Sequence, residues 1–310
     1  MKLSWMQFTE YTTVIEGRVM TDIVSLSELR LLSKQRADME DEQFITNDEW
    51  RRMLNRSYSE LYDLIVTSAN SEDYFLKSGT ITLVSGTSTY DLPTDFYKSR
   101  GVDLNTSGSE VPLSRYNFNE RNVGGLYATA SDMRYHIQSN SIVFNPKPSS
   151  SDTVTIYYIP SPRKFFEYST TAIVRGSTTQ WTVGTHSLLV DDLLDGVGFL
   201  AEDYNVLQTV TAVGATTVTT DLNSSALSDP TVFGKIESRY DFYSSWDEMV
   251  IVSTAISALI KEEADVSALL HIKQQIQDRI IAVSEMRDLG EPTTVVDVNN
   301  YNSLWNTATA

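Results

Sequence analysis

The stretch that decides the fold is residues 245–292, which read SWDEMVIVSTAISALIKEEADVSALLHIKQQIQDRIIAVSEMRDLGEP. Ser245 and Glu248 have the spacing of a capping box, and the apolar residues after them recur every three or four positions. The acidic link at residues 262–265 separates this helix from a second one, which Gly290 and Pro292 end. The sequence therefore predicts an αα-hairpin with one apolar face.

A helical pattern of the same kind occupies residues 25–69. The first helix is expected near residues 26–38, and the second keeps a 3.6-residue apolar period for about six turns. Two further capping boxes are predicted by the pairs Ser25–Glu28 and Thr46–Glu49. The three longest predicted helices lie at 47–69, 246–262 and 266–287. Because their apolar stripes have no other partner of matching length, we expect them to pack as one bundle around Ile276.

The regions between the helices alternate with the two-residue period of β-strands. Residues 79–92 predict a β-hairpin with its turn at 85–88. Further strands are expected at 101–104, 135–138, 141–144 and 153–159, with a turn at 139–140 and a short helical turn at 116–123. The stretch 168–237 is rich in Thr, Val, Gly and Ser and carries a second hairpin signal at 206–220. We interpret it as a separate all-β module.

The predicted fold class is α+β, with a helical bundle from the N- and C-terminal helices, a β domain and an inserted all-β module. The expected segments are an N-terminal arm (1–24), the N-terminal helices of the bundle (25–78), the β domain (79–165), the inserted module (166–238), the C-terminal helical hairpin of the bundle (239–289) and an extended C-terminal tail (290–310).

Composition excludes several classes of protein. The 310 residues include 24 Lys and Arg against 41 Asp and Glu, for a formal net charge of −17. Such a chain is no general nucleic-acid binder, and its binding to anionic membranes is disfavoured. Binding to either kind of anionic surface depends on Lys and Arg side chains of the protein. The absence of cysteine excludes disulfides, thiolate zinc sites and a Cys nucleophile. The longest apolar run, 249–260, is too short to span a membrane, and residues 1–10 lack the apolar core of a signal peptide.

Two motifs resemble ligand sites but lack the context that such sites need. Residues 196–201, GVGFLA, match the GxGxxA form of the dinucleotide fingerprint, yet no helix is predicted after them, so we interpret the glycines as turn residues. Asp191, Asp192 and Asp195 could suggest a calcium site. Because the EF-hand spacing is absent, we expect a solvated acidic turn instead.

Candidate catalytic groups do not converge in the sequence. The histidines His136, His186 and His271 lie in three different segments. Asp95, Asp103 and Glu110 could be imagined as a glycosidase pair, but pairs of carboxylates are common in so acidic a chain. An aromatic strip is interpreted as core or subunit contact rather than as a sugar-stacking site, and consists of Tyr157, Tyr158, Phe165, Phe166 and Tyr168. No catalytic residue, cofactor or metal ligand is predicted.

The order of the segments, together with short stretches inside them, carries a resemblance. These stretches are SELR (27–30), RAD (36–38), YDLPTDF (90–96), RGVD (100–103), FNERN (118–122), YHI (135–137), IVFNP (142–146), YYIP (157–160), KEEADVS (261–267), RDLGEP (287–292) and VDV (296–298). The chain resembles the head-to-tail connector adaptor proteins of tailed bacteriophages over about 25–165 and 240–300. The module at 168–237 and the first twenty or so residues lie outside that resemblance.

The resemblance implies a virion structural protein at the head–tail junction, made in the host cytoplasm and without enzymatic activity. Family members form a dodecameric ring, twelve copies of one chain, beneath the portal protein, and they extend the DNA channel used in genome ejection toward a tail tube or nozzle protein. An acidic channel wall would let DNA pass without specific binding. No membrane and no cofactor is expected. The portal-interface candidates are the apolar tail residues Val295, Val296, Val298, Tyr301, Leu304 and Trp305.

Two alternatives stay open. The protein could be another phage component, such as a tail-tube, baseplate or receptor-binding protein, with the all-β module as its binding part. It could also be a hydrolase acting on a cell-wall or surface glycan. The mass of the assembled particle would separate a ring protein from both.

Overall fold

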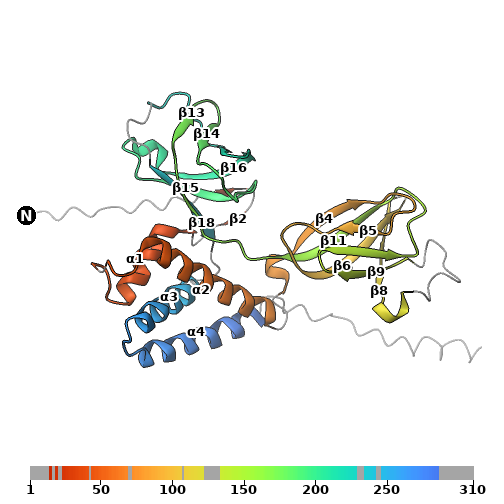
Figure 1. Ribbon diagram of the computed structural model, residues 1–310, viewed down its shortest axis with the longest axis horizontal. Coiled ribbons are helices and arrows are strands. Elements are labelled where there is room, and N and C mark those ends of the chain that lie inside the picture. The colour runs from red at the N-terminus through yellow and green to blue at the C-terminus, as the bar shows by residue number, and fades with distance from the viewer. Residues whose placement is uncertain are drawn as a thin grey trace, which may run out of the picture.

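The computed structural model describes residues 14–15, 18–19 and 23–285, except 42, 69–71, 107, 122–132, 229–233 and 242–245. A bundle of helices carries both β units: a β domain extends from one end of the bundle, and an all-β module lies on the bundle's side (Figure 1). The predicted α+β fold class is confirmed. The division into the expected segments stays a prediction, and the contacts between them are reported below.

The bundle consists of α1 (Leu26–Arg36), α2 (Asn47–Thr67), α3 (Asp247–Lys261) and α4 (Ser267–Glu285). Its apolar core combines residues of all four helices, among them Leu29, Leu54, Leu61, Met249, Ile256, Ile276 and Ile280. Helix α3 lies at the centre, since nine of its 15 residues are buried. The predicted bundle is therefore confirmed, and Ile276 is buried within it.

The starts of α1 and α2 follow the predicted capping chemistry. The Ser25 hydroxyl accepts a hydrogen bond from the backbone N–H of Glu28, and Thr46 and Glu49 form a complete capping box. Helix α3 differs, because Trp246 occupies its cap position and makes no side-chain cap bond. Ser245, Gly290 and Pro292, on which the other end signals rested, lie outside the described residues.

The β domain consists of two antiparallel-rich sheets that face one apolar core, formed by residues such as Val102, Ile142, Phe144, Val154 and Ile156. One sheet has the order β4 (Lys77–Thr82), β11 (Thr153–Pro160), β6 (Phe96–Thr106) and β7 (Ser109–Pro112). The other has the order β5 (Thr89–Asp91), β10 (Ser141–Asn145), β9 (Arg134–Gln138) and β8 (Ser114–Arg115).

The predicted hairpin at 79–92 is wrong. Strand β4 pairs with β11, and β5 pairs with β10, so the two strands lie in different sheets. The connection crosses between the sheets, and the Tyr90 hydroxyl ties it down by bonding to the backbone of Val84 and Thr87. Alternation identified both strands correctly, but it carries no information about the partner of each. The other expected strands, the turn at 139–140 and the helical turn, η2 (Phe118–Glu120), are confirmed.

The module is built on an eight-stranded sheet with its own apolar core, which includes Trp181, Leu194, Tyr204, Val210 and Ile236. The strand order is β12 (Glu167–Ser169), β18 (Lys235–Asp241), β15 (Leu193–Val197), β16 (Leu207–Val213), β17 (Thr217–Thr220), β14 (Thr179–Thr182) and β13 (Ala172–Val174). The predicted hairpin at 206–220 is confirmed as β16 and β17.

The eighth strand comes from the other end of the chain. Strand β3 (Ile23–Ser25) pairs antiparallel with the last residues of β18, and α1 begins at the next residue. Two short strands before it, β1 (Val14–Ile15) and β2 (Arg18–Val19), pair with each other. Residues of the predicted N-terminal arm thus complete the sheet of the module.

Candidate interaction surfaces

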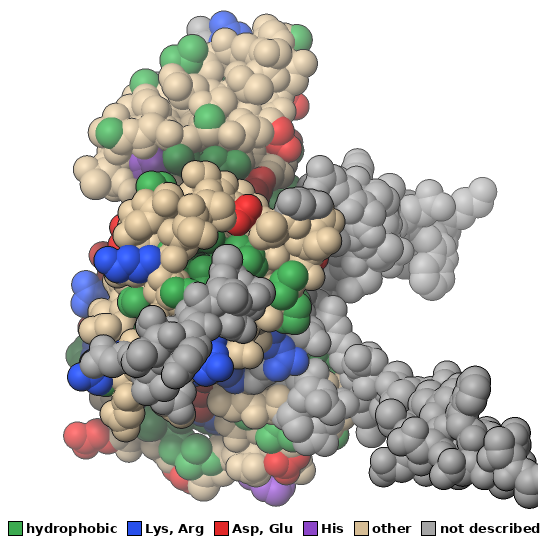
Figure 2. Space-filling model, turned by 90° about the vertical axis from the view of Figure 1, so that its right-hand side faces the viewer, with side chains coloured by type: hydrophobic (Ala, Val, Ile, Leu, Met, Phe, Trp, Pro, Cys, Tyr) green, Lys and Arg blue, Asp and Glu red, His purple; other side chains and the backbone are tan. Residues whose placement is uncertain are grey.

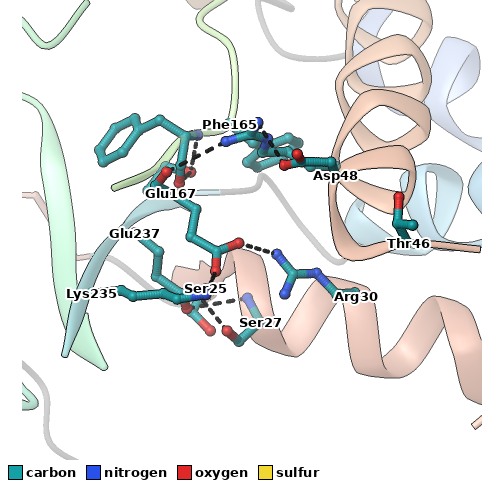
Figure 3. A network of polar contacts seen from close by, with 12 residues as sticks. Ser25, Ser27, Arg30, Thr46, Asp48, Phe165, Glu167, Lys235 and Glu237 are labelled. Carbon is teal, nitrogen blue, oxygen red and sulfur yellow. Dashed lines mark hydrogen bonds and ion pairs between the residues drawn. The ribbon is translucent and has the colours of Figure 1, made fainter. Parts of the chain in front are cut away.

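A network of buried polar side chains joins the module to the bundle (Figure 3). The most deeply buried carboxylate of this network belongs to Glu237 of β18, a residue that is only 2% exposed. The Glu237 carboxylate accepts hydrogen bonds from the backbone N–H of Ser27, at 3.1 Å, and from the Ser27 hydroxyl, at 2.5 Å. Because Ser27 lies in the first turn of α1, its N–H has no partner within the helix. A carboxylate of the module thus caps a helix of the bundle.

Glu167 of β12 is the second carboxylate of this network. Arg30 of α1 donates to one oxygen and Lys235 of β18 to the other, each at 2.5 Å. Burial alone would raise the pKa of Glu167, but the hydrogen bonds from Lys235 and Arg30 outweigh it, and the pKa lies below its ordinary value. Glu167 therefore stays ionised and paired at neutral pH, and it links the bundle to the neighbouring strands β12 and β18 of the module.

Helix α2 holds the chain that enters the module. The Asn55 amide accepts from the backbone N–H of Phe165 at 2.6 Å and donates to the Phe165 carbonyl at 3.2 Å. Arg51 donates to the carbonyl of Glu167 at 3.4 Å. The Phe165 ring lies against Tyr58 of α2 and Tyr240 of β18. Both polar and aromatic contacts therefore fix residues 165–167 against the bundle.

The predicted solvated acidic turn is wrong for two of its three aspartates. Asp192 and Asp195 are each only 8% exposed, since Asp192 pairs with Arg163 and Asp195 pairs with Arg239 at 3.0 Å. Burial raises the pKa of Asp195 although Arg239 acts in the opposite direction. Asp191 is exposed, at a turn with φ 69°. Within the described residues no group of three or more metal-ligating side chains is found.

The free end of the β domain contains a cavity of about 310 Å³, which we call the β-domain cavity. Its walls are mainly apolar and come from β6, β7 and the segments that connect the two sheets, with Leu83, Leu104, Val111, Leu113, Met133 and Pro148 among the lining residues. The exposed Lys147 and the carboxylate of Asp152 lie at its rim, and the Ser150 hydroxyl donates to Asp152. Since Thr82 pairs with Thr153 at this end and Lys77 pairs with Tyr158 at the other, the cavity lies away from the bundle.

Two exposed apolar side chains, Phe44 and Ile260, lie at the end of the bundle where α2 begins and α3 ends. Lys261 lies over the Phe44 ring at 4.6 Å and pairs with Glu49 at 2.9 Å. The hydrogen bond from Lys261 lowers the pKa of Glu49 to about 2. No helix among the described residues has the length and hydropathy that crossing a bilayer requires.

A sequence model of the family described as SU10 adaptor protein matches residues 11–233, which is most of the chain. The chain belongs to the SU10 adaptor protein family. It is thus a phage adaptor protein with a structural role, and the family is not one of known enzymes. No curated protein matches the sequence.

The range matched by the SU10 adaptor family corrects the extent of the resemblance. It includes residues 11–24 and nearly all of the module, which lie outside the stretches that carry the resemblance, and it ends before α3. The structure shows contacts between these regions. The sheet of the module contains β3, and carboxylates of the module bond to Ser27 and Arg30 of α1.

The remaining predicted sites fall in separate places. His136 lies on β9, the His186 ring nitrogen lies 3.3 Å from the carbonyl of Thr217 in the module, and His271 is exposed on α4. Asp95 is engaged by Tyr158 at 2.8 Å and by Lys77 at 3.3 Å, whereas Asp103 and Glu110 lie on β6 and β7 toward the other end. In the aromatic strip, Tyr158 and Phe165 are buried core residues.

Glycine is required at the two positions of the GxGxxA motif for different structural reasons. Gly196 lies in β15, and a Cβ atom there would come within 1.9 Å of the Tyr204 carbonyl oxygen. Gly198 follows β15 with φ +77°, which favours glycine in a turn.

The portal-interface candidates Val295, Val296, Val298, Tyr301, Leu304 and Trp305 lie outside the described residues. Sequence reasoning missed the junction formed by Glu237, Glu167 and Asn55, for which the sequence holds no local signal.

Proposed function

We propose that this phage adaptor forms the ring of a head-to-tail connector. In this proposal twelve copies bind beneath the portal protein at the capsid vertex, extend the DNA channel, and offer their other face to a tail tube or nozzle protein. The observation that carries the proposal is the match to the SU10 adaptor family over residues 11–233. The net charge of −17 supports it, since an acidic wall repels DNA and lets it slide.

The paired charges at the junction support a structural role in a ring. A subunit that contacts several neighbours must hold its parts in one arrangement, or each contact would cost additional ordering free energy. Glu237, Glu167 and Asn55 fix the module to the bundle through hydrogen bonds with defined directions. The subunit is thereby preorganised for contacts on more than one side.

The portal contact is assigned in this proposal to the C-terminal tail. Residues 290–310 have no helical or strand period, yet they include Val295, Val296, Val298, Tyr301, Leu304 and Trp305. Burying one large aromatic side chain contributes about 1.5–3 kcal/mol, so Tyr301 and Trp305 are the candidate anchors. In a closed ring each subunit repeats this contact, and the repeated contacts act together.

Truncation before Glu291 tests the proposal. We expect the melting temperature of the isolated subunit to stay nearly unchanged, because a segment without periodic pattern adds little to the core of the subunit. Assembly onto purified portal rings, followed by the mass of the complex, should be lost. The full-length Asn299→Ala variant is the matched control and should assemble normally. Assembly of the truncated protein would place the anchor elsewhere, with α3 and α4 the next segment to examine.

A further inference from the structure

One loop of the module presents an apolar side chain to solvent. It connects β15 to β16, spans residues 198–206, and is called here the Leu200 loop. Leu200 is 70% exposed, the highest value among the large apolar side chains of the described residues, and Val206 at the end of the loop is also exposed. Glu202 and Asp203 are exposed on the same loop. The loop therefore combines an apolar tip with negative charge.

The Leu200 loop is held in a fixed shape from below. The Asn205 amide accepts from the backbone N–H of Phe199 at 3.0 Å and donates to the Phe199 carbonyl at 2.9 Å, which closes the loop. The Phe199 and Tyr204 rings are buried in the module core, and the Tyr204 hydroxyl donates to the carbonyl of Ser228 at 2.9 Å. An exposed side chain on a preordered loop loses little conformational entropy on binding, as is typical of a contact residue.

The β-domain cavity has the complementary properties. Its walls are mainly apolar, and its volume of about 310 Å³ is at the lower end of the range of ligand sites, which suits an aliphatic side chain with its neighbours. Lys147 lies at the rim together with Asp152, whose carboxylate accepts a hydrogen bond from the Ser150 hydroxyl. Figure 2 shows exposed apolar side chains with several Lys and Arg side chains on the face that the β domain presents. Glu202 and Asp203 would meet Lys147 there.

The Leu200 loop and the cavity lie on opposite sides of the subunit. In Figure 1 the short teal coil of η5 (Glu202–Tyr204), which belongs to the loop, lies on the side of the module that faces away from the β domain. The cavity lies at the free end of the β domain. Two complementary surfaces at different places on one chain form heterologous contacts between copies, the kind of contact that closes rings.

We propose that the Leu200 loop of one subunit inserts Leu200 into the β-domain cavity of the next subunit. The occupant of the cavity is thus a second copy of this chain. This inference rests on the proposed ring and names the contact that closes it. Glu202 and Asp203 face Lys147 across the same contact, and the contact repeats around the ring.

The absence of cysteine from the chain allows a direct test by cross-linking. Chains carrying Leu200→Cys are mixed with chains carrying Val111→Cys, assembled on portal rings, and treated with a short thiol-reactive cross-linker. Val111 lines the cavity and is exposed, so its thiol is accessible. We expect a covalent dimer from the mixture, and a ladder of multiples of the subunit mass when both cysteines are in one chain. Val174→Cys replaces Leu200→Cys in the control, since Val174 is 58% exposed on the same module.

A second measurement avoids the geometry of the cross-link. Leu200→Ser should raise the subunit concentration needed for half-maximal ring assembly at least about tenfold, whereas Val174→Ser should leave it unchanged. Both side chains are exposed, so neither variant is expected to unfold the module. Charge reversal at Lys147→Glu should weaken assembly, and Glu202→Lys with Asp203→Lys in the same chain should restore it in part.

The outcomes separate this inference from the proposed function. Rings of full mass without the cross-link, or with equal cross-linking from Val174→Cys, overturn the contact and leave the ring proposal standing. A cross-link from Val111→Cys to Leu304→Cys, in place of Leu200→Cys, would mean that the C-terminal tail fills the cavity, and also overturns it. If no ring forms on the portal with the parent chain, both proposals fail.

Discussion

The β domain and the module are attached to the same bundle through different kinds of contact. The β domain is joined to α2 by apolar packing, in which Tyr62 and Val66 are buried with Ile159, and the Tyr62 ring stacks on Phe75 at 4.2 Å. The module is joined by paired charges, centred on Glu237 and Glu167, together with the aromatic contacts of Phe165 and Tyr240 with Tyr58. Apolar packing is non-directional, whereas hydrogen bonds to charged groups require defined geometry.

This difference assigns separate tasks to the two junctions. Apolar burial contributes most of the free energy that holds a β unit to the bundle, since charged groups must first lose their hydration. The charged junction contributes less net free energy, but it restricts the module to the orientation in which Ser27, Arg30 and Lys235 all reach their carboxylates. Variants in the bundle core, at the apolar junction and at the charged junction should therefore differ in how much stability they cost and in which part of the subunit loses protection.

The largest effect is expected from a change in the core of the helical bundle, to which both β units are attached. Ile276→Asp places an unpaired charge in the bundle core, where Ile276 is only 8% exposed, and should lower the free energy of unfolding by about 3–5 kcal/mol. Urea unfolding followed by circular dichroism measures it. Ile276→Val is the control, with an expected loss of about 1 kcal/mol. An Asp variant as stable as the parent would rule out the bundle core described here.

At the apolar junction, Tyr62→Ala should cost about 3 kcal/mol, because it removes a buried ring from the contact between α2, Phe75 and Ile159. The Tyr62 hydroxyl also donates to the carbonyl of Pro160, so Tyr62→Phe separates the two terms and should cost about 1 kcal/mol. Hydrogen exchange with mass spectrometry should show that backbone amides of β11, the strand that contacts α2, lose protection. A Phe variant as damaged as the Ala variant would mean that this junction too depends on polar contacts.

At the charged junction, Glu237→Ala should cost about 2 kcal/mol, since it leaves the Ser27 N–H and hydroxyl without their buried acceptor. Exchange protection should fall in β18 and in the first turn of α1, and stay unchanged in the β domain. Glu237→Gln keeps one oxygen acceptor and should cost less than the Ala variant. Loss of protection in the β domain as well would show that the two junctions are coupled.

The smallest effect should appear only in acid. The pKa of Glu167 is lower in the folded protein than the ordinary glutamate value of 4.5, so its ionised form stabilises the fold above that pH. This stabilisation should decline as the pH falls below about 4.5 and through the lowered pKa, while Asp195, whose pKa is raised, acts in the opposite direction. Protection of β12 measured from pH 6 to pH 3 should therefore fall faster in the parent than in Glu167→Gln. Equal pH profiles would contradict this role of Glu167.

The parts of the fold that depend on local sequence were predictable. The capping box of Thr46 and Glu49, the apolar stripe of α2 and the alternation of β9 and β10 each lie within one segment, and each has the expected structure. The hairpin at 79–92 was predicted wrongly because the partner of a strand depends on the whole sheet, and β11 lies about seventy residues away in sequence from β4.

The candidate surfaces were less predictable for the same reason. Asp192 and Asp195 look like solvated charges in sequence, and only the folded chain brings Arg163 and Arg239 to them. Asn55 and Phe165 are 110 residues apart, and an Asn within a helix carries no sign of a distant partner. The apolar tip at Leu200 also depends on tertiary structure, since Phe199 beside it is buried. The tail residues from Val295 to Trp305 stay a prediction.

The pairing of β3 with β18 has a consequence for the order in which the protein matures. Residues 23–25 leave the ribosome early, but their partners at 239–241 are synthesised more than two hundred residues later. The same delay applies to Ser27, which waits for Glu237, and to α1, which waits for α3. Contacts so distant in sequence raise the contact order and place their formation late in folding. A chain interrupted before β18 therefore has neither a complete module sheet nor a closed bundle, so only subunits translated through α3 present both.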